Sequence, residues 1–424
     1  MEPMREMWRH RGLRLIFLAN LISMIGSGMN AAAVIWYILQ ATHSEVSLGW
    51  LIALQTLPSM LLLPFTGVLI DREDRRHIMM GLDIARGLVI FLVAILVFTH
   101  HVRLWQLYAM NILVAIGFWM FFPTVNALIQ ELTPDGKMVD ANSLFLAALQ
   151  GGWLLAGAFV GFLYNHIGLG GVLLLDCTSY LGSILCIYYV RKGRVTVERP
   201  RPEAGEALPA GGAVARFVQE LAEGHRFVWK NRNVLLVGIA WALFVASMMT
   251  QGVLSAPLSE RILHGGAVGY GWLNGGWAVG AFVSVFYAAA AIRRYGAHRS
   301  VTATMSTIAL CLFLLPVSRW LALAVLIYFV MGSGRGVGGI AISSEMMEIV
   351  PRYMMGRVQN MVSFGASGLQ ILTALLVGEA AHRDGLMYGF WIVGAMYLGA
   401  GIAAWLPVRH APQARYQASD SAAD

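Results

Sequence analysis

Residues 104–130 read LWQLYAMNILVAIGFWMFFPTVNALIQ and contain no charged residue. A helix needs roughly 20 mostly apolar residues to cross a bilayer. The composition of the whole chain agrees, because its 424 residues are 58% hydrophobic and 12% charged, whereas a soluble domain carries roughly 25% charged residues. We therefore predict an all-α integral membrane protein. The low charge argues against a soluble enzyme, a nucleic-acid-binding module and a disordered chain.

Further apolar runs of this kind extend on both sides of residues 104–130. The first run is too long for the apolar core of a signal peptide, so we interpret it as a membrane helix. Polar, glycine-rich residues at 165–170 and 264–266 separate neighbouring runs. The sequence predicts twelve spans, at residues 13–39, 48–70, 77–98, 104–130, 142–164, 171–190, 234–258, 269–292, 300–317, 320–347, 358–379 and 386–406.

The basic residues predict the orientation of these spans. Twelve spans place both termini on one side, and 24 of the 30 Lys and Arg residues fall on that side. The opposite side has four, and the remaining two lie within spans. By the positive-inside rule, both termini are cytoplasmic. The net charge of +7 thus reflects topology, and we expect no nucleic-acid partner.

The long stretch between the sixth and seventh spans divides the chain. We predict an N-terminal six-helix bundle at 1–190, a cytoplasmic linker at 191–233, a C-terminal six-helix bundle at 234–408 and a cytoplasmic tail at 409–424. The linker ends in an amphipathic segment, and the halves look related at a shift of 217 residues. That segment has the apolar residues Val214, Phe217, Val218, Leu221 and Val228 at helical spacing. The shift aligns Glu131 with Glu348, Pro134 with Pro351, Gly151 with Gly368, Gly161 with Gly378, Gly168 with Gly385 and Tyr180 with Tyr397.

The loop after the second span carries a recognisable motif. It reads GVLIDREDRR from Gly67 to Arg76. This resembles the G-x-L-x-D-R-x-G-R-R signature of the major facilitator superfamily, with Asp74 in place of the second glycine. Residues 83–86, 123–129 and 141–142 resemble the bacterial branch that exports siderophores and drugs, which includes enterobactin and macrolide efflux pumps.

The resemblance implies two pseudo-symmetric six-helix bundles in the bacterial inner membrane, with substrate bound between them. It implies a secondary transporter and not an enzyme, with no cofactor, a proton gradient as energy source, a small-molecule substrate and a monomer in the lipid bilayer. The segment 157–161 resembles an antiporter signature, with Ala158 at a typical proline position. Whatever else they do, Gly157 and Gly161 should permit close helix packing.

The resemblance also implies a cytoplasmic gate. Gly67 and Asp71 belong to the motif, and Asp71 would accept hydrogen bonds from the start of the eleventh span, near Gly356. The basic residues Arg72, Arg75 and Arg76 would then pair with Glu131 and Glu348. The alternative is a basic loop that only follows the positive-inside rule.

Several ionisable residues lie within predicted spans, where they are costly. Asp83 and Arg86 lie three apart on one helix, so they form either a structural ion pair or a proton-coupling site. We expect a structural role for Asp176. Arg335 lies among glycines without an acid at helical spacing before Glu345, which suits an anionic substrate group or a distant partner.

As a set, deep aromatic and amide residues could line a cavity for an amphipathic compound, although for each one alone a lipid-facing position or packing between helices is the better interpretation. With Arg335, the candidate substrate-binding residues are Asn20, Asn30, Trp119, Gln150, Trp153, Trp241, Asn274 and Trp277. The three cysteines, Cys177, Cys186 and Cys311, lie in apolar runs and suggest no disulfide framework. The histidines lack metal-ligand spacing, and a nucleotide-binding loop of the G-x-x-x-x-G-K-[ST] type is missing from the sequence.

Together these features predict proton-driven efflux of a siderophore or drug-like compound by alternating access. Import of a small organic anion on the same fold, and a non-transporting membrane sensor, remain the alternatives.

Overall fold

The computed structural model describes residues 10–72, 74–133, 138–190, 212–351 and 354–406, and these are helical throughout apart from short connections. The first part of the chain forms α2 (Arg11–Thr42), α3 (Glu45–Arg72), α4 (Arg75–Phe98), α5 (Leu104–Leu132) and α6 (Met138–Tyr188). A separate helix, α7 (Gly212–Lys230), follows. The remainder forms α8 (Arg232–Thr250), α9 (Gly252–Pro257), the π-helix η1 (Leu258–Ile262), α10 (Gly266–Tyr295), α11 (Ala297–Leu314), the 3-10 turn η2 (Leu315–Val317), α12 (Leu321–Ile349), α13 (Met355–Arg383) and α14 (Leu386–Trp405).

The long helix α6 consists of two membrane-length arms. Gly168 has φ 64 and ψ −173, which breaks the helix inside the predicted turn at 165–170. A positive φ is readily available only to glycine. The predicted seventh span corresponds to α8, α9 and η1 in succession. Eleven helical segments are long and apolar enough to cross a membrane, so the described residues contain twelve when the arms of α6 are counted separately, and the predicted fold class is confirmed.

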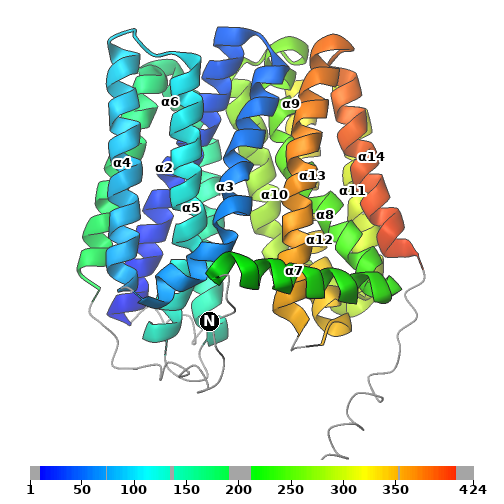
Figure 1. Cartoon of the computed structure of the whole chain (residues 1–424). Helices are drawn as coiled ribbons and strands as arrows, with labels where there is room; N and C mark the ends of the chain where they lie inside the picture. The colour runs from blue at the N-terminus through cyan, green and yellow to red at the C-terminus, as the bar shows by residue number, and fades with distance from the viewer. Residues whose placement is uncertain (1–9, 73, 134–137, 191–211, 352–353, 407–424) are drawn as a thin grey trace, which may run out of the picture.

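The helices pack as two groups that meet along a central seam. In the first group α6 lies along α2 and α4, while α5 packs on α3 and α4. In the second, α12 packs on α10 and α11, and α14 packs on α8 and α11. The seam joins α3 to α13 and α6 to α10, and Figure 1 shows α3 and α13 next to each other near the centre of the molecule.

The outer surface of the bundle is apolar. Phe286, Leu181 and Leu326 are all more than half exposed, although each lies on a helix of membrane-spanning length. A continuous apolar surface of this kind requires a hydrocarbon environment. The tryptophans near helix ends are exposed as well, as side chains that anchor a helix at the membrane interface should be: Trp50, Trp105, Trp320, Trp391 and Trp405.

Helix α7 lies across one end of the bundle, the end where α2 begins and α14 finishes (Figure 1). Its buried residues Phe217 and Val228 face the bundle, and the ring of Phe217 packs 6.3 Å from that of Phe364 in α13. Val218 was predicted on the same face but is 58% exposed, because the helix turns only part of its apolar side toward α13. The predicted linker residues 191–211, the tail at 409–424 and Val214 lie outside the described residues and side chains.

Candidate functional site

The motif loop connects α3 to α4 at the same end as α7. The side chains of Gly67, Asp71 and Arg72 lie outside those that the structure describes, so their gating role stays a prediction. Arg75 forms an ion pair with Glu131 of α5. Arg76 donates to the backbone carbonyl of Val190. Both contacts join helices of the first group to one another.

Asp74 occupies the position where the motif has its second glycine. It is the N-cap of α4, and its carboxylate accepts from the backbone N–H of Arg76 at 3.1 Å. Asp is a favoured N-cap because its oxygen satisfies an N–H group that lacks a helical partner. The substitution of the motif glycine therefore has a local structural use.

The second half of the predicted gate lies at the ends of α12 and α13. Glu348 is exposed near the end of α12, and Gly356 is exposed in the first turn of α13. The neighbouring Arg357 forms an ion pair with Glu223 of α7, at 2.9 Å. The linker helix is thereby tied to the second group.

A buried polar cluster occupies the interior of the first group. Asp83 and Arg86 of α4 form an ion pair with both side chains almost fully buried. The guanidinium also lies over the rings of Phe121 and Tyr180, 4.8 and 4.6 Å from the centroids. The predicted contact between Asp83 and Arg86 is thus present. The amide of Asn30 is buried in the same region and donates to Asp176 at 2.7 Å, so in this structure its side chain faces the interior of the first group.

Arg335 lies midway along α12 in the second group. Its guanidinium stacks over the ring of Trp277 in α10, 4.6 Å from the centroid. Its Nε approaches the sulfur of Met248, and the residue remains partly exposed. Of the candidate substrate-binding residues, Arg335 and Trp277 are brought into direct contact.

The other candidates are dispersed. Asn20 is buried and donates to the backbone carbonyl of Ile16, and Asn274 donates to that of Tyr270. Trp119 and Trp153 are 43% and 37% exposed. Gln150 and Trp241 are partly buried, and Trp241 packs on Phe244. The hydrogen bonds of Asn20 and Asn274 and the ring contact of Trp241 are with residues other than Arg335.

The seam is tightly closed at the end opposite α7. A Cβ atom on Gly49 of α3 would lie 2.6 Å from the carbonyl oxygen of Ala374 in α13, and one on Gly378 would lie 3.3 Å from the Cα of Gly49. Likewise, a Cβ on Gly271 of α10 would lie 3.0 Å from the Cα of Gly161 in α6. A Cβ atom on Gly157 would lie equally close to the backbone of α10, 3.1 Å from atoms of Asn274 and Gly275. The predicted close packing at Gly157 and Gly161 is therefore confirmed.

An ion cluster covers this closed end. The buried carboxylate of Glu45, in the first turn of α3, contacts Arg261 of η1 at 2.7 Å and His382 of α13 at 3.2 Å. Arg261 also donates to the carbonyl of His43 at 2.8 Å. We name Glu45, Arg261 and His382 the end cluster, and it joins the first group to the second.

Sequence reasoning did not identify the end cluster as a site. One signal was available, because Arg261 is among the four basic residues predicted on the side opposite the termini. Its partner Glu45 is 216 positions away, however, and His382 contacts Glu45 from 337 positions away, so no helical spacing links them.

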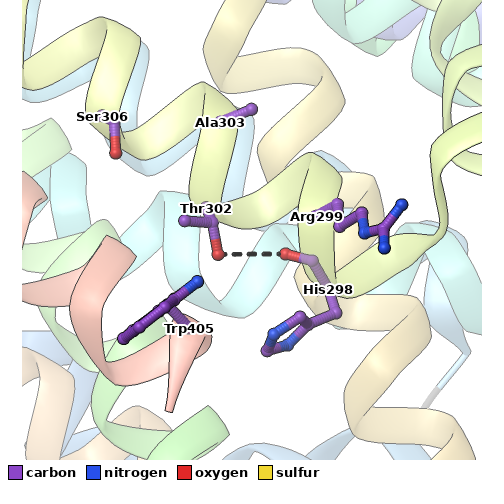
Figure 2. A pocket seen from close by; sticks show the side chains of 6 residues that line it. All are labelled: His298, Arg299, Thr302, Ala303, Ser306 and Trp405. Atoms are coloured by element: carbon purple, nitrogen blue, oxygen red, sulfur yellow. Dashed lines mark hydrogen bonds between the residues drawn. The ribbon is translucent and has the colours of Figure 1, made fainter. Parts of the chain in front are cut away.

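A surface pocket of about 450 Å³ lies between the start of α11 and the end of α14. Figure 2 shows the residues that line it, among them His298 and Arg299 on α11 and Trp405 at the end of α14. His298 Nδ1 lies 3.5 Å from the buried carboxylate of Glu345. None of the candidate substrate-binding residues lines this pocket, so it is separate from the seam.

Comparison with known proteins gives a consistent result. The family model of the Major Facilitator Superfamily matches residues 16–367. The MFS-type transporter YkuC of Bacillus subtilis is 24% identical over 92% of this chain and 91% of its own. The multidrug efflux pump Tap of Mycolicibacterium fortuitum is 24% identical over 92% of this chain and 94% of its own.

Two further similarities are narrower in what they show. Macrolide efflux protein A of Streptococcus pyogenes is 24% identical over 59% of each chain. The crystal structure of the nucleoside transporter NupG superposes with a TM-score of 0.71 at 12% identity, over 92% of this chain and 98% of its own. At that identity the superposition shows a shared fold and nothing about substrate.

Proposed function

Because this chain belongs to the major facilitator superfamily, whose members here are multi-pass membrane transporters and not enzymes, we propose that it exports an amphipathic small molecule in exchange for protons. The export direction is supported by the relatives named as macrolide and multidrug efflux pumps. The proposal includes no cofactor, a single chain as the working unit, a bacterial inner membrane and cytoplasmic termini.

One observation carries the proposal of alternating access. The seam is closed at the end opposite α7 by backbone contact at two glycine pairs and by the end cluster. At the other end, the ion pair of Arg75 stays within the first group. The ion pair of Arg357 joins the second group to α7. Such an arrangement corresponds to one of the two states that a transporter of this type exchanges, here the state closed to the periplasm.

The binding surface is proposed to include Arg335 and Trp277. Arg335 is a partly exposed residue whose guanidinium stacks on an indole, and this pair offers both a charge and an aromatic face to a ligand. Membrane-embedded charge is costly and is usually retained for a functional partner. This observation favours substrates with an aromatic or anionic group, and it also supports the second candidate function, import of a small organic anion.

The test uses everted membrane vesicles that contain the full chain. A radiolabelled macrolide and an anionic aromatic dye are offered separately, each with and without an imposed proton gradient. We expect accumulation inside the vesicles that collapses when a protonophore is added. Accumulation only in right-side-out vesicles would replace export by import, and transport unaffected by the protonophore would exclude proton coupling.

A further inference from the structure

The buried cluster of the first group contains more acid than base. Asp83, Arg86 and Asp176 are each 2% exposed or less, so two carboxylates share one guanidinium. Arg86 and Asp83 of α4 lie within electrostatic range of Asp176. The titratable groups beside Asp176 on its own helix, Tyr180 and Cys177, add no positive charge. With both acids ionised, this interior would carry one uncompensated negative charge, which is strongly unfavourable.

The contacts within the cluster distinguish the two acids. Asp83 holds the guanidinium directly. Among the described residues, the Asp176 carboxylate accepts hydrogen bonds from neutral groups: the amide of Asn30 at 2.7 Å and the hydroxyl of Ser179 at 3.3 Å. The ion pair therefore belongs to Asp83, and the excess acid is Asp176.

The backbone of α2 lies directly over this excess acid. A Cβ atom on Gly26 would lie 2.4 Å from Oδ1 of Asp176, so this face leaves no space for a positive side chain. A proton can neutralise Asp176 without any change in this packing.

We propose that Asp176 is a reversible proton-binding site. Its carboxylate takes a proton from a hydronium ion and becomes a neutral carboxyl group, with water as the other product. Release is the reverse step, so no other reactant is required. This assignment departs from the structural role that sequence reasoning gave to Asp176.

Through the position of Asp176, its proton can affect the contact between the two groups of helices. Its partner Asn30 lies on α2, and six residues further along the same helix Trp36 stacks on Tyr270 of α10, with ring centroids 5.7 Å apart. Gain or loss of the proton changes the hydrogen bond to Asn30, and α2 carries that change to the seam. This link rests on the proposed proton-driven transport, whereas proton binding itself does not.

The test measures the proton directly in the purified full chain. Infrared difference spectra between alkaline and acidic buffer should show the carbonyl stretch of a newly formed carboxyl group. The band should disappear in Asp176→Asn. Since Asp83→Asn also balances the charge of the cluster, the band should disappear there too, and these two variants alone cannot identify the carrier.

A matched pair of variants identifies the carrier. Asn30 donates to Asp176, and Ser183 neighbours Asp83. Asn30→Ala should shift the frequency of the band, while Ser183→Ala should leave it in place. A shift with Ser183→Ala alone would assign the proton to Asp83 and overturn the proposal. An absent band in the unmodified chain, or a band that survives Asp176→Asn, would overturn it as well.

Transport is measured separately so that the two ideas can fail independently. In the vesicle assay, Asp176→Asn should lose stimulation by the proton gradient while downhill exchange of the macrolide continues. If the unmodified chain shows the infrared band but no proton-driven transport, the proposed function fails and the proton site remains.

Discussion

Arg335 is the residue whose substitution best reports on substrate chemistry. Its guanidinium lies over Trp277 and remains partly exposed. We expect Arg335→Ala to weaken binding of an anionic aromatic compound by about 2 kcal/mol, the lower end for loss of a desolvated charge partner. A neutral analogue should be affected far less.

Counterflow in proteoliposomes with the matched anionic and neutral analogues provides the measurement for Arg335. Arg335→Lys should restore part of the affinity, because an ammonium group cannot reproduce the planar, two-pronged geometry of the guanidinium. Equal losses for both analogues would mean that Arg335 supports the fold, and the anionic-substrate proposal would be abandoned.

Helical spacing predicts contacts between residues close in sequence. Of the distant contacts, the pairing of Arg75 with Glu131 was expected from the family resemblance, and those within the buried cluster and the end cluster were not predicted. The three-residue spacing of Asp83 and Arg86 places them on one helical face, and their ion pair is present. Asn30 and Asp176 are 146 positions apart. Their contact depends on how α2 lies against α6, and helical periodicity carries no information about that packing.

At the level of elements, the length of the apolar runs predicted the spans, because the thickness of the bilayer determines how long a membrane-crossing helix must be. The internal repeat also aligns two positions at which one helix ends and the next begins. Gly168 and Gly385, aligned by the shift of 217 residues, both have positive φ values of 64° and 106° at the starts of new helical arms. The subdivision of the seventh span into α8, α9 and η1 was not predicted, although Gln251, Gly252 and Pro257 interrupt the apolar run where one helix gives way to the next.

The attachment of α7 to α13 allows a test at the same scale. A Cβ atom on Gly224 would lie 2.5 Å from the carbonyl oxygen of Arg357, and backbone cannot move aside cheaply. Gly224→Ala should therefore displace α7 and destabilise the protein by about 1–3 kcal/mol, as overpacking does. Gly356→Ala is the control, because its Cβ would meet nothing within 4 Å. Thermal unfolding in detergent measures both, and equal midpoints would show that α7 is not held by this contact.

The topology of the whole molecule can be checked with reporter fusions. The distribution of basic residues predicts cytoplasmic reporters at residue 205 and at the C-terminus, and periplasmic reporters near Glu45 and His264. The fold places the loops at Glu45 and His264 at the end of the bundle opposite α7. A periplasmic signal at residue 205 would reverse the orientation.

The end cluster should bias the molecule toward the state described. Arg261→Ala removes one partner of buried Glu45, at a cost of about 1 kcal/mol because Arg261 is 42% exposed and water screens the pair. We expect the closed end to open more often. A cysteine at Thr56, a position 3% exposed and bonded to Gln370 of α13, should then react faster with an impermeant maleimide.

The control for this measurement is Arg319→Ala, which removes an exposed basic residue predicted on the same side. It should leave the reactivity of the cysteine unchanged. An unreactive cysteine in Arg261→Ala would show that the end cluster does not hold the seam closed.

The glycine contacts along the seam have a mechanical consequence. At Gly49 against Gly378, and at Gly161 against Gly271, backbone touches backbone, so no side chain stands between the two groups at these points when one tilts over the other. The two glycine contacts can therefore act as pivots of the motion. The ionic contacts around them then set which tilt is preferred. Evolution could adjust the speed of the rocking motion and its resting position through different residues.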